Sequence, residues 1–404
     1  MTTVKKAKKT IPVVHLTDGL TRGGGIEVTL TQALARLGRT RYRIHVAVLE
    51  RKPNDLGGQL LSAGVPLHDL GAPWFRTFWA TLRLARLVRR EGIALVHANN
   101  PACILVALRV KRFVPALRVV GHLRGLLSLG VDGDPRRSRV RRARRRLEQL
   151  RRTVGFLDRI LCVSDAVRRS VEEELGLVAP LVEVVHNGRD LAPFRRYRDV
   201  EDRASSRRRL GFPSMGPLVT LVARLGSEKD FDTFLRAVCH VRAAIASARF
   251  VIVGEGRQRP MIEARIAELG LREAVTLTGY RSDIPEIMGA TDVFCLTSTS
   301  ESFGNVLVEA MAAGVPCVST DCGGPADIIT DGVDGYLVPV GDAEAVARAI
   351  VSILDDPEKM ARMRAAAARK SEDFSIDAMV EGWVRVYDEA LDLGAGASAA
   401  APVV

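Results

Sequence analysis

The chain has 404 residues, 47% of them hydrophobic and 26% charged, which is typical of a soluble globular protein and excludes a disordered one. This length exceeds what one ordinary core needs and suits two domains of similar size. No stretch approaches the roughly 18 uninterrupted apolar residues of a membrane-spanning helix, and the first apolar run, residues 11–16, is too short for the core of a signal peptide.

Charge is distributed unevenly between the two halves of the chain. Residues 1–200 contain 38 Lys and Arg against 17 Asp and Glu, a net charge of +21. Residues 201–404 contain 21 against 30, a net charge of −9. We therefore expect the first half to face an anionic partner.

Strand-like apolar runs alternate with helical patterns along the whole chain, which predicts parallel sheets wrapped by helices. The expected strands of the first half are Ile11–His15, Ile44–Leu49, Ala94–His97, Leu117–Gly121, Arg159–Val163 and Val182–Val185, with helices such as Ile26–Leu37 and Thr77–Arg90 between them. The expected strands of the second half are Leu218–Val222, Phe250–Val253, Val275–Thr278, Val293–Leu296, Cys317–Ser319 and Tyr336–Val338.

This pattern predicts an α/β protein with two Rossmann-like, doubly wound domains and a ligand cleft between them. The expected parts are a basic disordered tail at 1–10, an N-terminal domain at 11–197, a polar linker at 198–217, a C-terminal domain at 218–375, an amphipathic helix at 376–393 and a frayed tail at 394–404.

The segment Arg136–Arg152 has ten arginines in seventeen residues, and apolar residues recur at three- and four-residue spacing. It predicts an amphipathic helix with a strongly cationic face, on which Arg141, Arg142, Arg145 and Arg146 are candidates for contact with a membrane or an acceptor. Such a face suits anionic lipid or a polyprenyl-diphosphate acceptor, and a solvated charged face is the alternative. Aromatic residues do not interleave the arginines, which weighs against single-stranded nucleic acid.

The most informative segment is the stretch from Glu301 to Glu309, in which a Ser-Phe-Gly-Asn turn separates two carboxylates. Helix-forming residues follow, until Gly314 and Pro316 end the helix. Because a helix rises about 1.5 Å per residue, the two carboxylates can hold opposite ends of one elongated ligand. The N–H groups at the helix start offer a seat for a phosphate between them.

The Glu-x7-Glu segment and the Ala-Met-Ala-Ala-Gly-Val-Pro run after it resemble the donor site of the retaining GT-B glycosyltransferases of family 4. Shorter pieces occur in the order of that family: Gly23-Gly24-Gly25-Ile26-Glu27, Val185-His186-Asn187-Gly188-Arg189-Asp190, Val222-Ala223-Arg224-Leu225, Glu228-Lys229, Val253-Gly254-Glu255-Gly256 and Gly279-Tyr280-Arg281. The resemblance covers almost the whole chain. In the second piece the family usually has Pro-Asn-Gly-Val-Asp, so this chain departs from the pattern there.

The resemblance implies how a nucleotide-diphosphate-sugar donor is held. Arg224 and Lys229 are expected to bind the diphosphate, since Arg supplies a fork and Lys a point charge. Glu309 is expected to accept both ribose hydroxyls, and Glu301 to lie near the sugar, where charge develops. The remaining phosphate contacts are expected from backbone N–H groups of Gly24, Gly25, Phe303, Gly304, Asn305 and Val306.

Other residues have candidate roles. His122 follows the expected strand Leu117–Gly121 and, by the resemblance, reaches the donor sugar, although a lone histidine is more often structural. His97 and Asn99 are candidates on the acceptor side. Tyr280 and Arg281 are expected beside the base.

Two segments resemble motifs of other enzyme classes. Asp132-Gly133-Asp134 has the Asp-x-Asp form of metal-dependent transferases, but its Pro- and Arg-rich flanks favour a turn. Gly254-Glu255-Gly256 resembles a dinucleotide fingerprint, but Arg259 stands where the third glycine belongs. We therefore expect neither a metal nor a nicotinamide cofactor.

Together these features predict a retaining, metal-independent hexosyltransferase. It would move a sugar from a UDP- or GDP-sugar to a hydroxyl acceptor, such as a lipid-linked or cell-surface polysaccharide or glycolipid intermediate. A GT-B nucleotide-sugar epimerase, or a non-catalytic lipid- or nucleic-acid-binding protein built on the arginine-rich helix, are the alternatives. The six cysteines show no Cys-x-x-Cys spacing, so buried free thiols in a reducing cytosol are expected. The expected localisation of the protein is the cytoplasm, with the inner face of the plasma membrane as the surface that the arginine-rich helix could contact.

Overall fold

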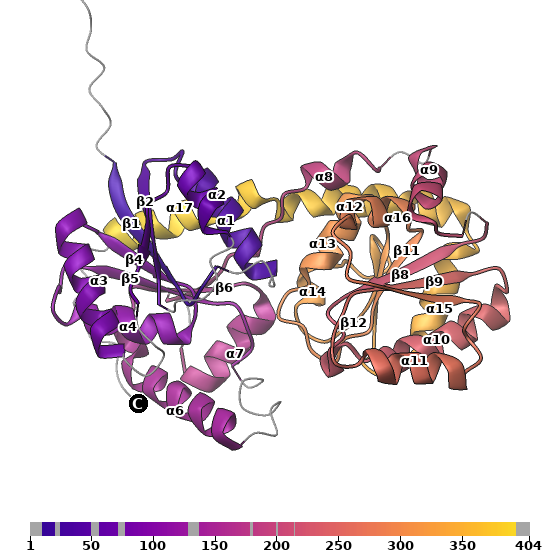
Figure 1. Ribbon diagram of the computed structural model, residues 1–404, viewed down its shortest axis with the longest axis horizontal. Helices are drawn as coiled ribbons and strands as arrows, with labels where there is room; N and C mark the ends of the chain where they lie inside the picture. Colours follow the sequence, from indigo (N-terminus) through magenta and orange to yellow (C-terminus); the bar gives the residue numbers. More distant parts are fainter. Residues whose placement is uncertain are drawn as a thin grey trace, which may run out of the picture. The chain divides into compact units, whose positions relative to one another are not determined.

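The computed structural model describes residues 10–20, 25–49, 56–71, 77–127, 137–177, 181–198, 201–213 and 215–392, with backbone alone at 25–27, 77, 137–143, 201–204 and 392. The chain forms two compact units, which Figure 1 shows in indigo to magenta and in magenta to orange, with the yellow C-terminal helix. Unit 1 contains Met1–Gly188 and Ile376–Val404, and unit 2 contains Arg189–Ser375.

Unit 1 is a parallel seven-stranded sheet in the order β3-β2-β1-β4-β5-β6-β7. Its strands are β1 (Ile11–Thr17), β2 (Tyr42–Val48), β3 (Leu67–Asp69), β4 (Leu95–Ala98), β5 (Arg118–Leu123), β6 (Arg159–Cys162) and β7 (Val182–Val184). Its helices are α1 (Gly25–Leu37), α2 (Gly57–Ser62), α3 (Thr77–Glu91), α4 (Pro101–Lys111), α6 (Arg137–Thr153), the 3-10 turn η1 (Val154–Phe156), α7 (Asp165–Leu175) and α17 (Ile376–Asp392). The order reverses between β1 and β4, so loops after these strands open onto a natural ligand site.

Unit 2 repeats the same plan with a parallel six-stranded sheet in the order β10-β9-β8-β11-β12-β13. Its strands are β8 (Leu218–Val222), β9 (Arg249–Val253), β10 (Val275–Gly279), β11 (Val293–Leu296), β12 (Cys317–Thr320) and β13 (Gly335–Val338). Its helices are α8 (Ala192–Arg195), α9 (Glu201–Leu210), η2 (Ser227–Lys229), α10 (Phe231–Ala244), α11 (Arg259–Glu268), α12 (Ile284–Ala290), α13 (Asn305–Ala312), α14 (Pro325–Ile328), α15 (Ala343–Leu354), α16 (Pro357–Lys370) and η3 (Ser371–Phe374). The prediction of two parallel-sheet α/β domains is confirmed.

The linker expected at 198–217 is instead built into unit 2, which begins at Arg189 and not after residue 197. Arg207 on α9 explains the difference. The residue is 8% exposed, and its guanidinium donates to the carbonyl oxygens of Ala290 (2.9 Å) and Gly216 (3.0 Å) and to the carboxylate of Asp292. A polar run can thus be a packed helix when one arginine satisfies buried acceptors.

Helix α17 completes the core of unit 1. It packs against α1, and its Trp383 and Tyr387 are 0% exposed among apolar side chains of β1, β2 and α1. At Gly382 a Cβ atom would lie 2.8 Å from a methyl group of Val185, so only glycine allows this approach without a shift. Chain segments nearly 200 residues apart in sequence therefore share one core.

Candidate functional site

The predicted donor residues of unit 2 gather at the carboxyl end of its sheet. Arg224 follows β8, Glu301 follows β11, and Tyr280 follows β10. Strands β8 and β11 are the neighbours at which the strand order reverses. Loops from such a pair diverge and leave room for a ligand, so this edge is the expected position of a site.

Lys229 and Glu301, 72 residues apart, form an ion pair through Nζ and Oε2. Their side chains are 15% and 21% exposed, so water screens the pair only partly. The two loops are also joined directly: Thr299 N–H donates to Glu228 O (2.9 Å), and Thr297 Oγ1 lies 3.0 Å from Lys229 O. A diphosphate that binds Lys229 must therefore share it with Glu301.

Arg224 is much more open. Its side chain is 76% exposed and its Nη2 lies 2.6 Å from Oε1 of Glu228, four residues later in the chain. Exposed pairs of this kind contribute about 0–1 kcal/mol, so Arg224 can turn to an anion at little cost.

The turn between the two carboxylates is held rigidly. Gly304 has φ +108°, a conformation that side chains disfavour, and it caps the start of α13. Phe303 is 2% exposed and packs edge-on against Phe374 at 5.7 Å. A Cβ on Gly324 would lie 2.3 Å from Phe303 Cα, so the two backbones touch.

Two polar atoms beside this turn have no hydrogen-bond partner among the described residues. They are Oγ of Ser300 and Oδ1 of Asn305, and both are buried. Buried polar atoms normally find partners, so a bound molecule or water is expected to supply them. Sequence reasoning missed Ser300, because a serine in a turn carries no signal of its own.

Glu309 on α13 is 8% exposed, and its Oε1 accepts from Nη2 of Arg189. The Arg189 side chain is 16% exposed, and the backbone N–H of Arg189 donates to Phe374 O (2.9 Å). The carboxylate expected to bind ribose is thus already paired. Sequence reasoning did not assign Arg189 a role, although it stands where the related motif has valine.

The Gly254-Glu255-Gly256 segment allows two backbones to approach. A Cβ would lie 1.9 Å from Ala223 O at Gly254 and 2.3 Å from Leu225 O at Gly256. The two glycines thus allow the loop after β9 to pack directly against the loop after β8.

The two residues expected beside the base lie in the loop after β10. Tyr280 is 76% exposed, and Arg281 pairs with Asp283. This hydrogen bond lowers the pKa of Asp283 and raises that of Arg281. Base binding by these residues stays a prediction.

In unit 1, the placement of His122 differs from the expectation that it follows a strand. Strand β5 runs on to Leu123, so His122 lies inside it and is 0% exposed. Its Nδ1 lies 2.9 Å from Nε2 of His97. The other ring nitrogen of His97, Nδ1, lies 2.6 Å from the hydroxyl of Tyr387, and Nε2 of His15 lies 2.9 Å from the same hydroxyl. Burial lowers the pKa of His15 to about 3 and keeps the pKa of His97 and His122 well below the usual value.

These histidines are therefore neutral, and the residue that does follow β5 is Arg124. Its guanidinium lies 5.9 Å from the Trp383 ring and 3.3 Å from the side-chain oxygens of both Asn99 and Asn187. A cation thus stands where the sequence suggested an imidazole.

Several predicted residues lie wholly or partly outside the described residues. Gly24, Asp132 and Asp134 are outside them, and Gly25 is described only as the first residue of α1. Arg141 and Arg142 lie on α6 with side chains outside the described part, whereas Arg145 and Arg146 are exposed. Across the described ranges, no helix is both long and apolar enough to cross a membrane.

Comparison with known families decides the identity of the fold. Residues 23–193 match Glycosyltransferase Family 4, and residues 202–370 match Glycosyl transferases group 1. The chain belongs to the family 4, group 1 glycosyltransferases. The resemblance predicted from the motifs is confirmed.

Relatives and a solved structure agree with this glycosyltransferase assignment. The chain is 30% identical to 2-deoxystreptamine glucosyltransferase of Streptomyces kanamyceticus, over 56% of this chain and 58% of that protein. It is 36% identical to D-inositol 3-phosphate glycosyltransferase of Salinispora arenicola, over 52% of this chain and 50% of that protein. The chain thus spans about half the length of these relatives. The crystal structure of Anabaena HepE in complex with UDP shares the fold, with TM-score 0.78 and 23% identity over 94% of this chain and all of HepE.

Proposed function

We propose that this glycosyltransferase transfers a hexose from a UDP- or GDP-sugar to a hydroxyl acceptor with retention of anomeric configuration and without a metal ion. The observation that carries the proposal is the Lys229–Glu301 pair at the strand-order reversal of unit 2, beside the start of α13. The UDP bound to HepE and the sugar transfers named for the relatives support a nucleotide-sugar donor.

The donor would lie across the carboxyl end of the sheet. Lys229, Arg224 and the N–H groups that begin α13 would neutralise the diphosphate. Glu309 would accept the ribose hydroxyls, and Glu301, next to Lys229, would stabilise positive charge that develops on the sugar.

The reaction proceeds by front-face attack. The bond from the anomeric carbon to the phosphate oxygen breaks, and its electron pair stays on the departing diphosphate. The acceptor oxygen bonds to the anomeric carbon on the same face, and its proton passes to the departing phosphate oxygen. The cations stabilise the leaving group, so a divalent ion is dispensable.

The acceptor is proposed to reach the enzyme at the cytoplasmic face of an anionic membrane. The arginine-rich α6 gives unit 1 the charge for such contact. Lipid-linked sugars or glycolipid intermediates meet this requirement.

A donor screen tests the proposed function. The protein is incubated in EDTA with UDP- and GDP-sugars, and release of nucleotide diphosphate is measured together with calorimetric binding of UDP and GDP. Glu309→Ala should weaken nucleotide binding, whereas Glu301→Gln should preserve it and slow transfer, because it acts where charge develops. Failure of the wild-type protein to bind either nucleotide would refute the proposed function, and identical behaviour of the two variants would refute the division of roles.

A further inference from the structure

The segment Asn187–Arg189, called the crossing segment below, carries the chain from unit 1 into unit 2 and is fixed in both. Within unit 1, Nη1 of Arg124 lies 3.3 Å from Oδ1 of Asn187. Within unit 2, the backbone N–H of Arg189 donates to Phe374 O (2.9 Å). These two contacts hold the backbone from which the Arg189 side chain extends.

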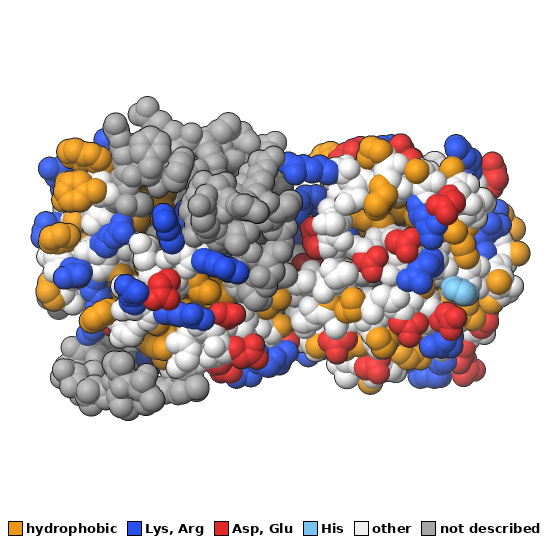
Figure 2. Space-filling model, turned by 90° about the horizontal axis from the view of Figure 1, so that it is seen from below, with side chains coloured by type: hydrophobic (Ala, Val, Ile, Leu, Met, Phe, Trp, Pro, Cys, Tyr) orange, Lys and Arg blue, Asp and Glu red, His pale blue; other side chains and the backbone are white. Residues whose placement is uncertain are grey.

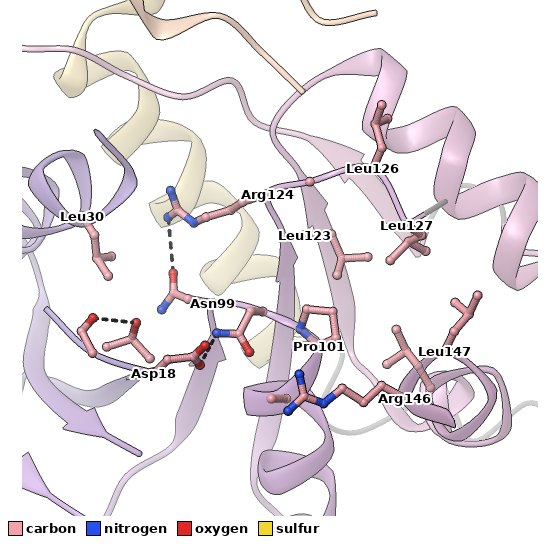
Figure 3. Close-up of a pocket in the computed structure, with 16 residues that line it drawn as sticks. Asp18, Leu30, Asn99, Pro101, Leu123, Arg124, Leu126, Leu127, Arg146 and Leu147 are labelled. Atoms are coloured by element: carbon pink, nitrogen blue, oxygen red, sulfur yellow. Dashed lines mark hydrogen bonds between the residues drawn. The ribbon is translucent and has the colours of Figure 1, made fainter. Parts of the chain in front are cut away.

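The anchor in unit 1, Arg124, is itself held on several sides. It borders a cavity of about 470 Å³ at the carboxyl ends of β1, β4 and β5, with α6 along one side (Figure 3). Figure 3 shows its guanidinium bonded to the side-chain oxygen of Asn99, at 3.3 Å, and the same group lies 5.9 Å from the ring of Trp383. Because these partners restrict Arg124, it can fix the crossing segment through Asn187.

The side chain of Arg189 binds the carboxylate of Glu309 on α13 through one oxygen only. Nη2 of Arg189 donates to Oε1, whereas no described residue bonds to Oε2. The two side chains are 16% and 10% exposed, so water screens this ion pair only weakly. The two oxygens of Glu309 are therefore unequal acceptors, because the guanidinium partly neutralises the charge on Oε1 and leaves that on Oε2.

Packing fixes this pair relative to the turn between the two carboxylates of the donor site. Phe374, whose carbonyl oxygen accepts from the backbone of Arg189, packs edge-on against Phe303 of that turn at 5.7 Å. Gly304 then caps the start of α13, and Glu309 lies on that helix. The guanidinium, the turn and the carboxylate thus belong to one packed cluster, so Arg189 sets the direction in which Oε2 faces.

We propose that Arg189 is a positioning residue that makes Glu309 select one ribose hydroxyl of the donor instead of binding both alike. Oε2 accepts the selected hydroxyl at full strength, and the other hydroxyl meets only the partly neutralised Oε1. This inference rests on the proposed role of Glu309 at the ribose. Valine, which the related motif has at position 189, donates no side-chain hydrogen bond, so a chain with valine there leaves both oxygens equally available.

Nucleotides that lack one ribose hydroxyl test the proposal. UDP, 2′-deoxy-UDP and 3′-deoxy-UDP, or the guanine series if the wild-type protein binds GDP, are titrated into the full chain by calorimetry. One deoxy analogue should bind the wild-type protein roughly ten- to a hundredfold more weakly than the parent nucleotide, because it loses a hydrogen bond to a charged group. The other should bind nearly as tightly as the parent, and it identifies the hydroxyl that faces Oε1.

Arg189→Val should abolish this difference, so that both analogues bind more weakly than the parent nucleotide by the same factor. Arg364→Val is the matched control. Arg364 is 14% exposed and pairs with Asp292 (3.2 Å), which precedes β11 at the opposite end of the sheet from the donor site. The control thus also loses a buried ion pair of unit 2, but it should keep the difference between the analogues that the wild-type protein shows.

Equal affinities of the two analogues for the wild-type protein, or a difference that persists in Arg189→Val, would overturn the proposal. The wild-type comparison needs no variant, so the proposal is tested even if Arg189→Val does not fold. The proposed function fails separately, when the wild-type protein binds neither UDP nor GDP. Tight binding of the parent nucleotide without a loss for either analogue would instead keep the donor site and refute the selection of a ribose hydroxyl by Glu309 and Arg189.

Discussion

The two units have the same doubly wound plan, but they handle charge at the carboxyl ends of their sheets in opposite ways. In unit 2 the cations there are paired with carboxylates: Lys229 with Glu301, Arg224 with Glu228 and Arg189 with Glu309. Acidic and basic side chains also interleave on the face of unit 2 in Figure 2. In unit 1 three buried histidines stay neutral and Arg146 has no partner in the described part of the chain. An anion bound to unit 2 would therefore share each of these cations with a carboxylate. In unit 1, by contrast, Arg146 has no such carboxylate among the described residues.

The largest expected effect is the loss of folding stability at acidic pH, and unit 1 should unfold before unit 2. The folded pKa of His15, His97 and His122 is depressed, while unfolded histidine has a pKa of about 6.5. Below pH 6.5 the unfolded state therefore binds more protons, and stability falls toward pH 3, by about 1 kcal/mol per histidine per pH unit. Hydrogen exchange at pH 7 and pH 5 should show the amides of unit 1 losing protection before those of unit 2.

Variants sharpen this test of acid sensitivity. His122→Gln should make stability less dependent on pH, because it removes one of the three depressed groups. His240→Gln, at an exposed histidine on α10 of unit 2, is the matched control. The same pH dependence in both variants would contradict the role of the buried cluster.

The next largest effect should follow Arg189→Ala in unit 2. It leaves the buried Glu309 without its partner, which typically costs about 3 kcal/mol, and each kcal/mol lowers the melting temperature by roughly 2–4 °C. Adding Glu309→Gln should recover part of the loss. Arg348→Ala, which breaks an exposed pair with Glu344, should change the melting temperature far less. If calorimetry finds equal melting temperatures for the two single variants, the buried pair is not a stabilising feature.

A smaller effect, on catalysis, is expected from the cations of the donor site. Lys229→Ala or Arg224→Ala removes a charge-assisted hydrogen bond to the diphosphate, of about 1.5–3 kcal/mol, and should lower kcat/KM roughly ten- to a hundredfold. Arg362→Ala on α16, which breaks another exposed pair, is the control and should leave kcat/KM unchanged. Steady-state kinetics in which both donor-site variants match this control would remove the diphosphate assignment.

The smallest effect per residue concerns membrane contact by α6. Changing Arg141, Arg142, Arg145 and Arg146 to Gln should weaken binding to anionic vesicles by about 1 kcal/mol per cation. High salt should weaken it too, since it shortens the screening length. Sedimentation with anionic and neutral vesicles measures it, and equal sedimentation with both would leave α6 without a membrane role.

The sequence predicted the sheets well, because buried parallel strands are continuous apolar runs. Every expected strand has its counterpart, and the short β3 is a strand that the sequence did not predict. The sequence also did not predict the extent of β5, which continues two residues past Gly121 to Leu123. His122 was therefore expected after the strand, although it lies within it. Strand ends depend on hydrogen bonds to neighbours that are distant in sequence.

The site shows the same limit more strongly. The motif located Glu309 and Glu301, but the partners of these carboxylates lie 120 and 72 residues away. Neither pairing has a local signal. The cavity of unit 1 could also not be predicted from the sequence, because it forms where the loops after three strands meet one face of α6.

Helix α17 has a consequence for the order in which the protein folds during synthesis. Unit 2 is a continuous stretch, Arg189–Ser375, and all of it has been translated before α17 exists. The core of unit 1 contains Trp383 and Tyr387, both 0% exposed. One apolar face of the sheet of unit 1 therefore stays uncovered until α17 has been synthesised. The unit whose synthesis begins first therefore completes its folding last. A chaperone that shields the nascent chain would have to bind unit 1 for the longest time.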